Sequence, residues 1–292
     1  MDSSWLKGVG TALVTPFDRD QLDLAALKKI IDFNLIHGVD FLVPLGTTGE
    51  TSTLRADECN TIIHHTIEVN AGRVPVVNGM FGKNNTRQVL ELIKGSSFEG
   101  IKAILVASPY YNKPSQAGLI AHFTAIADTS PVPVILYNVP SRSAVNLNTD
   151  SVLTLAEHQN IVGIKEASGD FNQIMQVLKY KPSSFELLSG DDPLTLPMIA
   201  CGAGGVISVI SNAFPLQFTK MVDAALNSDF VTSKMYNDLL LDIHKWLYIE
   251  GNPVGIKACL NLLGYCRDEV RLPLVSLSAS NKQLLAGAIK SL

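Results

Sequence analysis

Lys165 ends a run of apolar residues, and its type and position suggest nucleophilic chemistry. The four residues before it are small or branched and apolar, as in a parallel-sheet strand covered on both faces. With alternating side chains, Ile161, Gly163 and Lys165 should share one face, where Gly163 leaves space beside the amine, while Val162 and Ile164 point the other way. An amine at the edge of an apolar interior has its charged form disfavoured, which favours Schiff-base chemistry. The alternative is a lysine that leaves the strand and reaches water.

The loop Gly46-Thr47-Thr48-Gly49-Glu50 follows another apolar run and has the composition of an anion cradle. Its two glycines let the backbone approach a ligand closely, and successive amides with the hydroxyls of Thr47 and Thr48 can hold a carboxylate. An ordinary turn is the alternative for this loop. Arg142, which follows a further apolar run, can hold a second carboxylate in bidentate fashion.

Tyrosines at two other strand ends could transfer protons. Tyr137 should share a strand face with Ile135 and therefore project inward, whereas Tyr111 lies beside Tyr110 in a loop. For the adjacent pair, packing or an interface is the alternative. An amine, phenols, hydroxyls and an anion cradle at the strand ends of one sheet together suggest carbonyl chemistry on a keto acid.

Eight short apolar runs, separated by amphipathic stretches, must position these side chains. The predicted strands are Thr11–Thr15, Phe41–Gly46, Val74–Gly79, Ile101–Ala107, Val132–Asn138, Ile161–Lys165, Phe185–Gly190 and Gly205–Val209. Helical patterns between them include Asp23–His37, Asp57–Asn70, Thr86–Lys94 and Ala117–Asp128. Strands alternate with helices, and eight strands is the number that closes a parallel sheet into a barrel. The pattern therefore predicts an α/β protein with a (β/α)8 TIM barrel, whose chemistry sits at the carboxyl ends of the strands. A doubly wound sheet would also alternate, but no G-x-G-x-x-G follows the first strand.

The remainder of the chain contains no further predicted strand. Residues 1–225 are therefore predicted to form the catalytic barrel, and residues 226–292 a small C-terminal helical domain. The three helices expected in this appendage are Phe230–Tyr248, Pro253–Leu263 and Asn281–Leu292.

Composition excludes several classes of protein. The 292 residues are 47% hydrophobic and 17% charged, with a formal net charge of −4. We therefore expect a large core and no basic surface of the kind that binds nucleic acid. No apolar run approaches the roughly 18 residues needed to cross a membrane. Four scattered cysteines and the polar start Met1-Asp2-Ser3-Ser4 favour a reducing cytoplasm. The histidines show no metal-ligand spacing. For Asp191-Asp192 we favour a loop cap over a cation site, so we predict no metal and no cofactor.

The strand-end motifs, in their order along the chain, resemble those of the dihydrodipicolinate synthase family. They are Gly46-Thr47-Thr48-Gly49-Glu50, Pro109-Tyr110-Tyr111-Asn112, Tyr137-Asn138-Val139-Pro140-Ser141-Arg142, Gly163-Ile164-Lys165-Glu166-Ala167 and Ser189-Gly190-Asp191-Asp192. The similarity runs essentially from end to end and includes Asn252-Pro253 and Arg271-Leu272-Pro273 in the tail.

The resemblance implies a lyase that condenses pyruvate with L-aspartate 4-semialdehyde, in the branch leading to diaminopimelate and lysine. Lys165 would form a Schiff base with pyruvate, and its enamine would attack the aldehyde before transimination closes a ring. Tyr137, Thr47 and Tyr111 would form the proton relay, with Tyr111 reaching in from a neighbouring subunit of a homotetramer built as a dimer of dimers.

The resemblance also implies the substrate contacts. Thr47 and Thr48 would hold the pyruvate carboxylate and Arg142 that of the semialdehyde, while Gly190 and Ile207 complete the predicted substrate-binding set. Regulation stays open, because the positions expected to line a lysine effector cleft hold the atypical residues Ala56, Cys59 and Gln88.

Two alternatives remain. One is another pyruvate-dependent aldolase, such as N-acetylneuraminate lyase or an enzyme that cleaves 2-keto-3-deoxy sugar acids. The second threonine of the Gly46–Glu50 loop and the segment Pro140-Ser141-Arg142 favour the synthase. The other alternative is a metabolite-binding barrel without catalysis, which would not need the complete set of relay residues.

Overall fold

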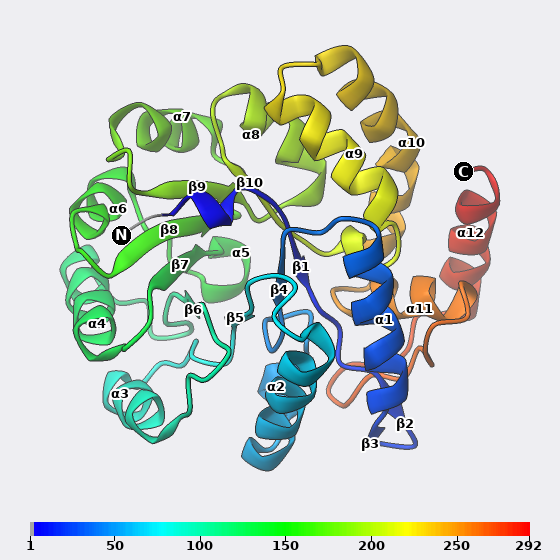
Figure 1. The fold of residues 1–292 in the computed structure, drawn as a ribbon, viewed down its shortest axis with the longest axis horizontal. Coiled ribbons are helices and arrows are strands. Elements are labelled where there is room, and N and C mark those ends of the chain that lie inside the picture. Colours follow the sequence, from blue (N-terminus) through cyan, green and yellow to red (C-terminus); the bar gives the residue numbers. More distant parts are fainter. Residues whose placement is uncertain (1–2) are drawn as a thin grey trace.

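Eight parallel strands form a ring that helices surround, which confirms the predicted barrel (Figure 1). The computed structural model describes residues 3–292; Met1 and Asp2, which entered the expectation about an export signal, lie outside them. The ring strands are β1 (Gly8–Ala12), β4 (Phe41–Val43), β5 (Val77–Asn78), β6 (Ala103–Ala107), β7 (Val134–Asn138), β8 (Ile161–Glu166), β9 (Glu186–Ser189) and β10 (Gly205–Ser208).

The two end strands of the hydrogen-bonded sheet meet and close the ring. The sheet order is β4-β1-β10-β9-β8-β7-β6-β5, and a parallel bridge joins Leu42 of β4 to Val76, the residue before β5. The Leu42 amide also donates to the Pro75 carbonyl at 3.0 Å. All eight carboxyl ends therefore point to the same end of the barrel.

Most ring strands are followed by a helix, and many of these helices begin at a polar capping residue. Asp23, Ser115 and Asp170, for example, accept hydrogen bonds from amides in the first turns of α1, α4 and α7. The helices are α1 (Leu24–Ile36), α2 (Ala56–Asn70), α3 (Thr86–Gly95), α4 (Gln116–Thr129), α5 (Pro140–Ser143), α6 (Thr149–Ala156), α7 (Phe171–Tyr180), α8 (Thr195–Ala200), α9 (Pro215–Leu226), α10 (Phe230–Tyr248), α11 (Val254–Leu262) and α12 (Ala279–Lys290). Short 3-10 turns are η1 (Ser4–Leu6), η2 (Thr51–Thr53), η3 (Asp192–Leu194) and η4 (Ile210–Asn212).

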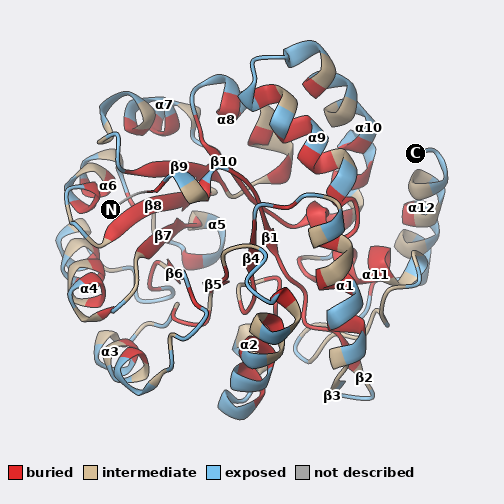
Figure 2. Ribbon diagram, viewed as in Figure 1, coloured by how far each residue is buried: buried red, intermediate tan, exposed pale blue. Residues whose placement is uncertain are grey.

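The core has two layers, one inside the ring and one between the ring and the helices (Figure 2). The inner layer includes Phe41, Leu105, Ile135 and Leu188, and Leu6 of η1 packs into it. The outer layer is larger and contains the apolar faces of the helices. Strands buried on both sides carry apolar residues at every position, which explains the continuous apolar runs of the sequence.

The first strand begins earlier than predicted, at Gly8 and not at Thr11. The added residues include Gly8 and Gly10, and glycine is disfavoured in strands on propensity alone. Both glycines are required here by close packing. A Cβ at Gly10 would lie 2.0 Å from the Phe41 ring, and Gly8 has a φ of +93°. Contacts between strands therefore override the local preference.

A short hairpin of β2 (Phe17–Asp18) and β3 (Gln21–Leu22) was not predicted. Both of its turn residues, Arg19 and Asp20, have positive φ, as in a type I′ turn, but the usual glycine or asparagine signal is missing. Glu269 accepts hydrogen bonds from the amides of both turn residues, so a distant segment holds the turn.

The three predicted C-terminal helices are present as α10, α11 and α12. The bounds of α10 match the predicted Phe230–Tyr248. The last helix begins at Ala279, two residues before the predicted Asn281, because the Ser278 side chain accepts a hydrogen bond from the Asn281 amide and caps it.

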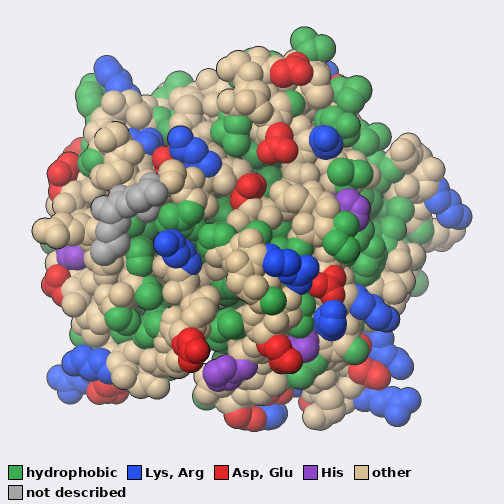
Figure 3. Space-filling model, viewed as in Figure 1, with side chains coloured by type: hydrophobic (Ala, Val, Ile, Leu, Met, Phe, Trp, Pro, Cys, Tyr) green, Lys and Arg blue, Asp and Glu red, His purple; other side chains and the backbone are tan. Residues whose placement is uncertain are grey.

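Charged side chains of both signs are mixed over the face of the molecule that Figure 3 shows. In Figure 3, Lys and Arg side chains are interspersed with Asp and Glu, and hydrophobic side chains lie between them. No helix within residues 3–292 is long and apolar enough to cross a membrane.

Candidate active site

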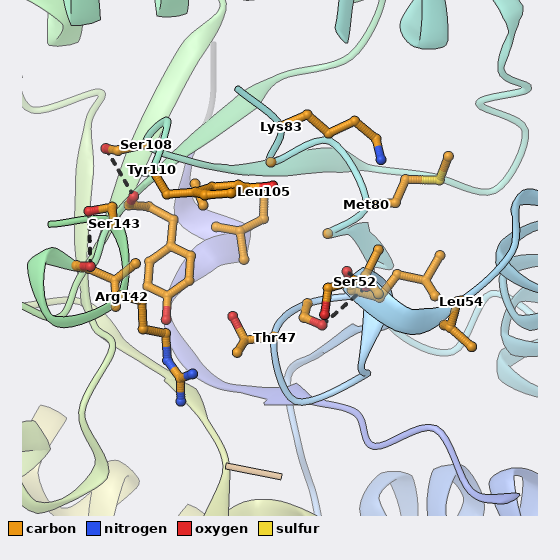
Figure 4. A pocket seen from close by; sticks show the side chains of 18 residues that line it. Thr47, Ser52, Leu54, Met80, Lys83, Leu105, Ser108, Tyr110, Arg142 and Ser143 are labelled. Carbon is orange, nitrogen blue, oxygen red and sulfur yellow. Dashed lines mark hydrogen bonds between the residues drawn. The ribbon is translucent and has the colours of Figure 1, made fainter. Parts of the chain in front are cut away.

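Two adjoining cavities open near the carboxyl ends of the ring strands. The lysine cavity, about 440 Å³, is lined by Lys165 and by residues that follow β4, β7, β9 and β10. The side cavity, about 510 Å³, lies toward β5 and β6 and extends past Met80 and Lys83 (Figure 4). The residues that line both cavities are Thr47, Tyr137, Val139 and Arg142.

Lys165 and Tyr137 face each other in the lysine cavity. They are paired across the neighbouring strands β8 and β7, and the Lys165 Nζ lies 4.5 Å from the centre of the Tyr137 ring. Only 5% of Lys165 is exposed. Tyr137 and Ile135 both belong to the inner layer, as strand alternation predicted. The amine is therefore held beside a phenol at a protected site.

Gly190, and not Gly163, provides the space for the lysine side chain. A Cβ at Gly190 would lie 3.0 Å from the Lys165 Cγ and 3.1 Å from its Cε. A Cβ at Gly163 would instead meet the Glu186 carbonyl oxygen at 2.6 Å. The prediction that Gly163 leaves space beside the amine is therefore wrong, because that position is occupied by the neighbouring strand.

The predicted division of faces along β8 is also wrong in part. Gly163 and Lys165 do share the inner face, but Ile161 packs in the outer layer with Ile164, while Val162 packs inside. The pairing register of β7 and β8 shifts between Val134 and Ile135, as at a β-bulge. A bulge of this kind exchanges the inner and outer faces of the strand residues that precede it. The amino-acid pattern does not reveal such a bulge.

A polar contact on the outer side of the sheet holds the same pair of strands together. Asn138 follows Tyr137, Glu166 follows Lys165, and the two are cross-strand neighbours. The Asn138 Nδ2 donates to both Glu166 carboxylate oxygens, at 3.1 and 3.0 Å, and Gln173 and Ser168 donate to the same carboxylate. Burial raises the pKa of Glu166, and these hydrogen bonds oppose the rise.

The Gly46–Glu50 loop presents Thr47 to both cavities and is anchored by Asn252, which lies between α10 and α11, and by Lys257 on α11. Thr48 is buried, and its hydroxyl accepts a hydrogen bond from the Asn252 side-chain Nδ2 at 3.0 Å. Glu50 has a positive φ of 54°, and its carboxylate contacts the fully buried Lys257 Nζ at 2.6 Å. The loop therefore depends on contacts more than 200 positions along the sequence.

Arg142 lies on the short helix α5, at the junction of the cavities. Figure 4 shows its side chain extending toward Thr47, with Lys83 and Met80 across the side cavity. No hydrogen bond or ion pair reaches its guanidinium from residues 3–292. Its donors are therefore available to an anionic ligand.

Some predicted site residues lie outside the cavities of their own chain. Tyr111 is 88% exposed with a φ of 71°, and it lines neither cavity, although Tyr110 lines the side cavity. Ile207 is buried in the inner layer without lining either cavity, whereas Gly190 lines the lysine cavity. The three positions named for an effector cleft, Ala56, Cys59 and Gln88, line neither cavity.

One wall of the lysine cavity was not found by sequence reasoning. It consists of Asp191 after β9, of His244, Lys245 and Tyr248 on α10, and of Asn252. Burial lowers the pKa of His244, and burial followed by the nearby Asp192 raises the pKa of Tyr248 well above its ordinary value. Two motifs in the sequence pointed to this wall, Ser189-Gly190-Asp191-Asp192 and Asn252-Pro253, but neither indicated the three residues of α10.

Asp192 has a structural role, as the loop-cap interpretation of Asp191-Asp192 predicted, whereas the Asp191 side chain makes no capping hydrogen bond to η3. Its carboxylate accepts hydrogen bonds from the Val209 and Ile210 amides and from the Tyr248 hydroxyl. Among residues 3–292 no cluster of three or more His, Cys, Asp or Glu side chains could hold a metal ion.

Comparisons with known proteins agree with this arrangement. A model of the dihydrodipicolinate synthetase family matches residues 5–292. A 4-hydroxy-tetrahydrodipicolinate synthase from Koribacter versatilis is 45% identical, with 98% of each chain covered.

Solved structures of the same name have the same fold. A dihydrodipicolinate synthase from Thermotoga maritima superposes with a TM-score of 0.95 at 38% identity, covering 97% of each chain. One from Acinetobacter baumannii, solved in complex with pyruvate, superposes with a TM-score of 0.94 at 36% identity, covering 98% of each chain. With the family model matched over nearly the whole length, this chain belongs to the dihydrodipicolinate synthetase family.

Proposed function

We propose that this protein is a 4-hydroxy-tetrahydrodipicolinate synthase that condenses pyruvate with L-aspartate 4-semialdehyde through a Schiff base on Lys165. The observation that carries the proposal is the buried Lys165 amine beside the Tyr137 ring, in a cavity that also contains Arg142, whose guanidinium has no hydrogen-bond or ion-pair partner among residues 3–292. The names of the relatives and the pyruvate complex of the Acinetobacter baumannii protein support the choice of substrates.

In this mechanism Lys165 supplies the electron sink. Its neutral amine attacks the keto carbon of pyruvate, water leaves, and the resulting imine loses a methyl proton to give an enamine. The enamine carbon then forms a bond to the aldehyde carbon of the second substrate. Attack of that substrate's amino group on the imine carbon closes the ring and releases Lys165.

Each addition and loss of water requires a proton donor and acceptor. Tyr137 is the nearest candidate, because its ring packs against the Lys165 amine. Thr47 lines the same cavity and can pass a proton through its hydroxyl. We propose that the exposed Tyr111 of a neighbouring subunit completes this relay, because Tyr111 lines neither cavity of its own chain.

Two carboxylates need separate partners. We assign the pyruvate carboxylate to the hydroxyls and amides of Thr47 and Thr48, close to Gly190, and the semialdehyde carboxylate to the Arg142 guanidinium. Ile207 would act from the inner layer by shaping the floor below the cavity.

The wider assignment follows from the same chemistry. We propose a cytoplasmic homotetramer, a dimer of dimers, in the pathway to diaminopimelate and lysine, with no cofactor or metal. We place the catalytic barrel at residues 1–225 and the C-terminal unit at residues 226–292, although α10 contributes one wall of the lysine cavity.

Trapping of the imine tests the proposal. Borohydride with pyruvate should add the mass of one reduced pyruvate, and peptide mapping should place it on Lys165. Lys165→Ala and Lys165→Arg should abolish the adduct and turnover, whereas the exposed Lys179→Ala should retain both. An adduct on any other lysine would contradict the assignment.

A competition assay separates the rival functions. Pyruvate consumption with aspartate semialdehyde, and no pyruvate release from sialic acid or 2-keto-3-deoxy sugar acids, is the expected pattern. Release from a sugar acid alone would favour the other aldolases. Binding of pyruvate without an adduct would favour a non-catalytic barrel.

A further inference from the structure

The proposed second substrate has a charge that the site as described so far leaves unmatched. L-Aspartate 4-semialdehyde carries an α-ammonium group as well as the carboxylate assigned to Arg142. Ring closure requires this ammonium to lose a proton, because only a neutral amine has the lone pair that attacks the imine carbon. A base must therefore lie close to the imine nitrogen of Lys165.

Asp191 is the only acidic residue that lines the lysine cavity within the described part of the chain. Its position follows from the sheet order, in which β8 lies between β7 and β9. Arg142 follows β7 and Asp191 follows β9, so opposite charges flank Lys165 at the end of β8. This arrangement matches a ligand that carries a carboxylate and an ammonium on one carbon.

The backbone of Asp191 is fixed, but its carboxylate is uncommitted. The amide donates to the Ser189 Oγ at 3.2 Å, and the carbonyl accepts from the Ser189 hydroxyl at 2.8 Å and from the Thr195 hydroxyl at 3.1 Å. No hydrogen bond or ion pair reaches the carboxylate from residues 3–292, in contrast to the carboxylate of Asp192. A positioned acid without a structural partner is available for a ligand.

The surroundings of this carboxyl make it a stronger base than an ordinary aspartate. Burial raises the pKa of Asp191, the neighbouring Asp192 raises it further, and Lys165 opposes the rise. A base works best when its pKa lies near the working pH. The other titratable or charged groups lining the cavity are Tyr137, Arg142, Lys165, His244, Lys245 and Tyr248.

We propose that Asp191 binds the ammonium group of the second substrate and acts as the base in the ring-closing transimination, an inference that rests on the proposed function. The Asp191 carboxylate takes one ammonium proton, and the freed lone pair forms a bond to the carbon of the protonated imine, whose nitrogen keeps its own proton. The bond from that carbon to the Lys165 nitrogen then breaks, and its electron pair stays on that nitrogen, which takes a proton from the attacking nitrogen. The ring C=N bond forms as the last N–H proton is released to water.

The test compares a substrate that has the amino group with one that lacks it. The variant is Asp191→Asn, which keeps the size of the side chain and removes its charge and basicity. The control is Asp242→Asn, which removes the same charge from an exposed position on α10. The probe without an amino group is 4-oxobutanoate, which has the same aldehyde and the same chain length.

For Asp191→Asn we expect pyruvate trapping to be retained and inhibition by 4-oxobutanoate to be little changed. Turnover of aspartate semialdehyde should fall by about 10²–10⁴-fold, the usual effect of losing a positioned base. The acidic limb of the kcat/KM profile should disappear in Asp191→Asn, return in part in Asp191→Glu, and persist in Asp242→Asn.

Three results would overturn the inference. Equal weakening of both aldehydes would make Asp191 a general structural residue. A higher KM with unchanged kcat would reduce it to a binding group. Loss of pyruvate trapping in Asp191→Asn alone would place it in the first half-reaction, whereas failure of the wild type to trap pyruvate would refute the proposed function itself.

Discussion

Tyr137 and Lys165 are cross-strand neighbours at the carboxyl ends of β7 and β8, and the Lys165 Nζ lies 4.5 Å from the centre of the Tyr137 ring. Packing of the ring and chemistry of the hydroxyl can be separated by substitution. Tyr137→Phe keeps the ring against the amine and removes only the proton-transfer group.

We expect Tyr137→Phe to retain the fold and to lower kcat by about 10²–10⁴-fold, the typical contribution of a positioned acid or base. Steady-state kinetics together with circular dichroism measure both properties. The control is Tyr180→Phe, which alters a tyrosine that is 61% exposed. A Tyr137→Phe enzyme with near-normal kcat would remove Tyr137 from the relay.

The sequence predicted the barrel well because strands buried on both faces and capped helices leave regular patterns. It also identified the strand ends at which Thr47, Tyr137, Arg142 and Lys165 lie in one pair of cavities. These positions depend only on where a strand ends and on the common direction of parallel strands.

The errors have a different physical origin, because they concern contacts between distant segments. The bulge between β7 and β8 exchanged the faces of Ile161 and Val162, and the close approach of the Glu186 carbonyl fills the space that Gly163 was expected to leave. The periodicity of α10 predicts a buried face but not that His244 and Tyr248 pack against the cavity. Long-range packing of this kind leaves no local pattern.

The Arg142 guanidinium should select the second substrate and not the first. Arg142→Ala should raise KM for aspartate semialdehyde about tenfold or more, because a charge-assisted bidentate contact is lost. Pyruvate trapping should be unaffected, as should both properties in the exposed Arg87→Ala control. Equal damage to the use of both substrates would show a structural arginine.

The buried pair of Glu50 and Lys257 should be important for stability. Lys257→Met leaves the Glu50 carboxylate buried without its 2.6 Å partner, which should lower the free energy of unfolding by about 3–5 kcal/mol. Adding Glu50→Gln removes the uncompensated charge, so the double variant should be more stable than Lys257→Met alone. Urea denaturation measures both, and a double variant less stable than Lys257→Met would contradict this explanation.

His122 should make the fold sensitive to acid. Burial lowers the pKa of His122 to about 4 from its ordinary 6.5. Between these two values the unfolded chain binds a proton that the fold excludes, so stability is complete above pH 6.5 and falls as the pH falls. The steepest loss should be roughly 1.4 kcal/mol per pH unit.

Urea denaturation at several pH values should therefore show a smaller loss of stability on acidification for His122→Gln than for the wild type. His64→Gln, at an exposed position on α2, is the matched control. An unchanged pH dependence in His122→Gln would assign the acid sensitivity to other groups.

Tyr111 provides a test of assembly. Its side chain is 88% exposed and lines neither cavity of its own chain, and we propose that it acts in the site of a neighbouring subunit. Aromatic residues are favoured at the cores of interfaces, where they bury a large area and keep a polar tip for a partner.

If Tyr111 completes the neighbour's relay, then Lys165→Ala and Tyr111→Phe are each inactive for different reasons. A mixed dimer of the two variants contains one site with both an intact Lys165 and an intact Tyr111 from its neighbour. Activity should therefore return in part when the variants exchange subunits, with exchange followed by native mass spectrometry. Exchange without recovery would place Tyr111 in its own subunit's site or outside the chemistry.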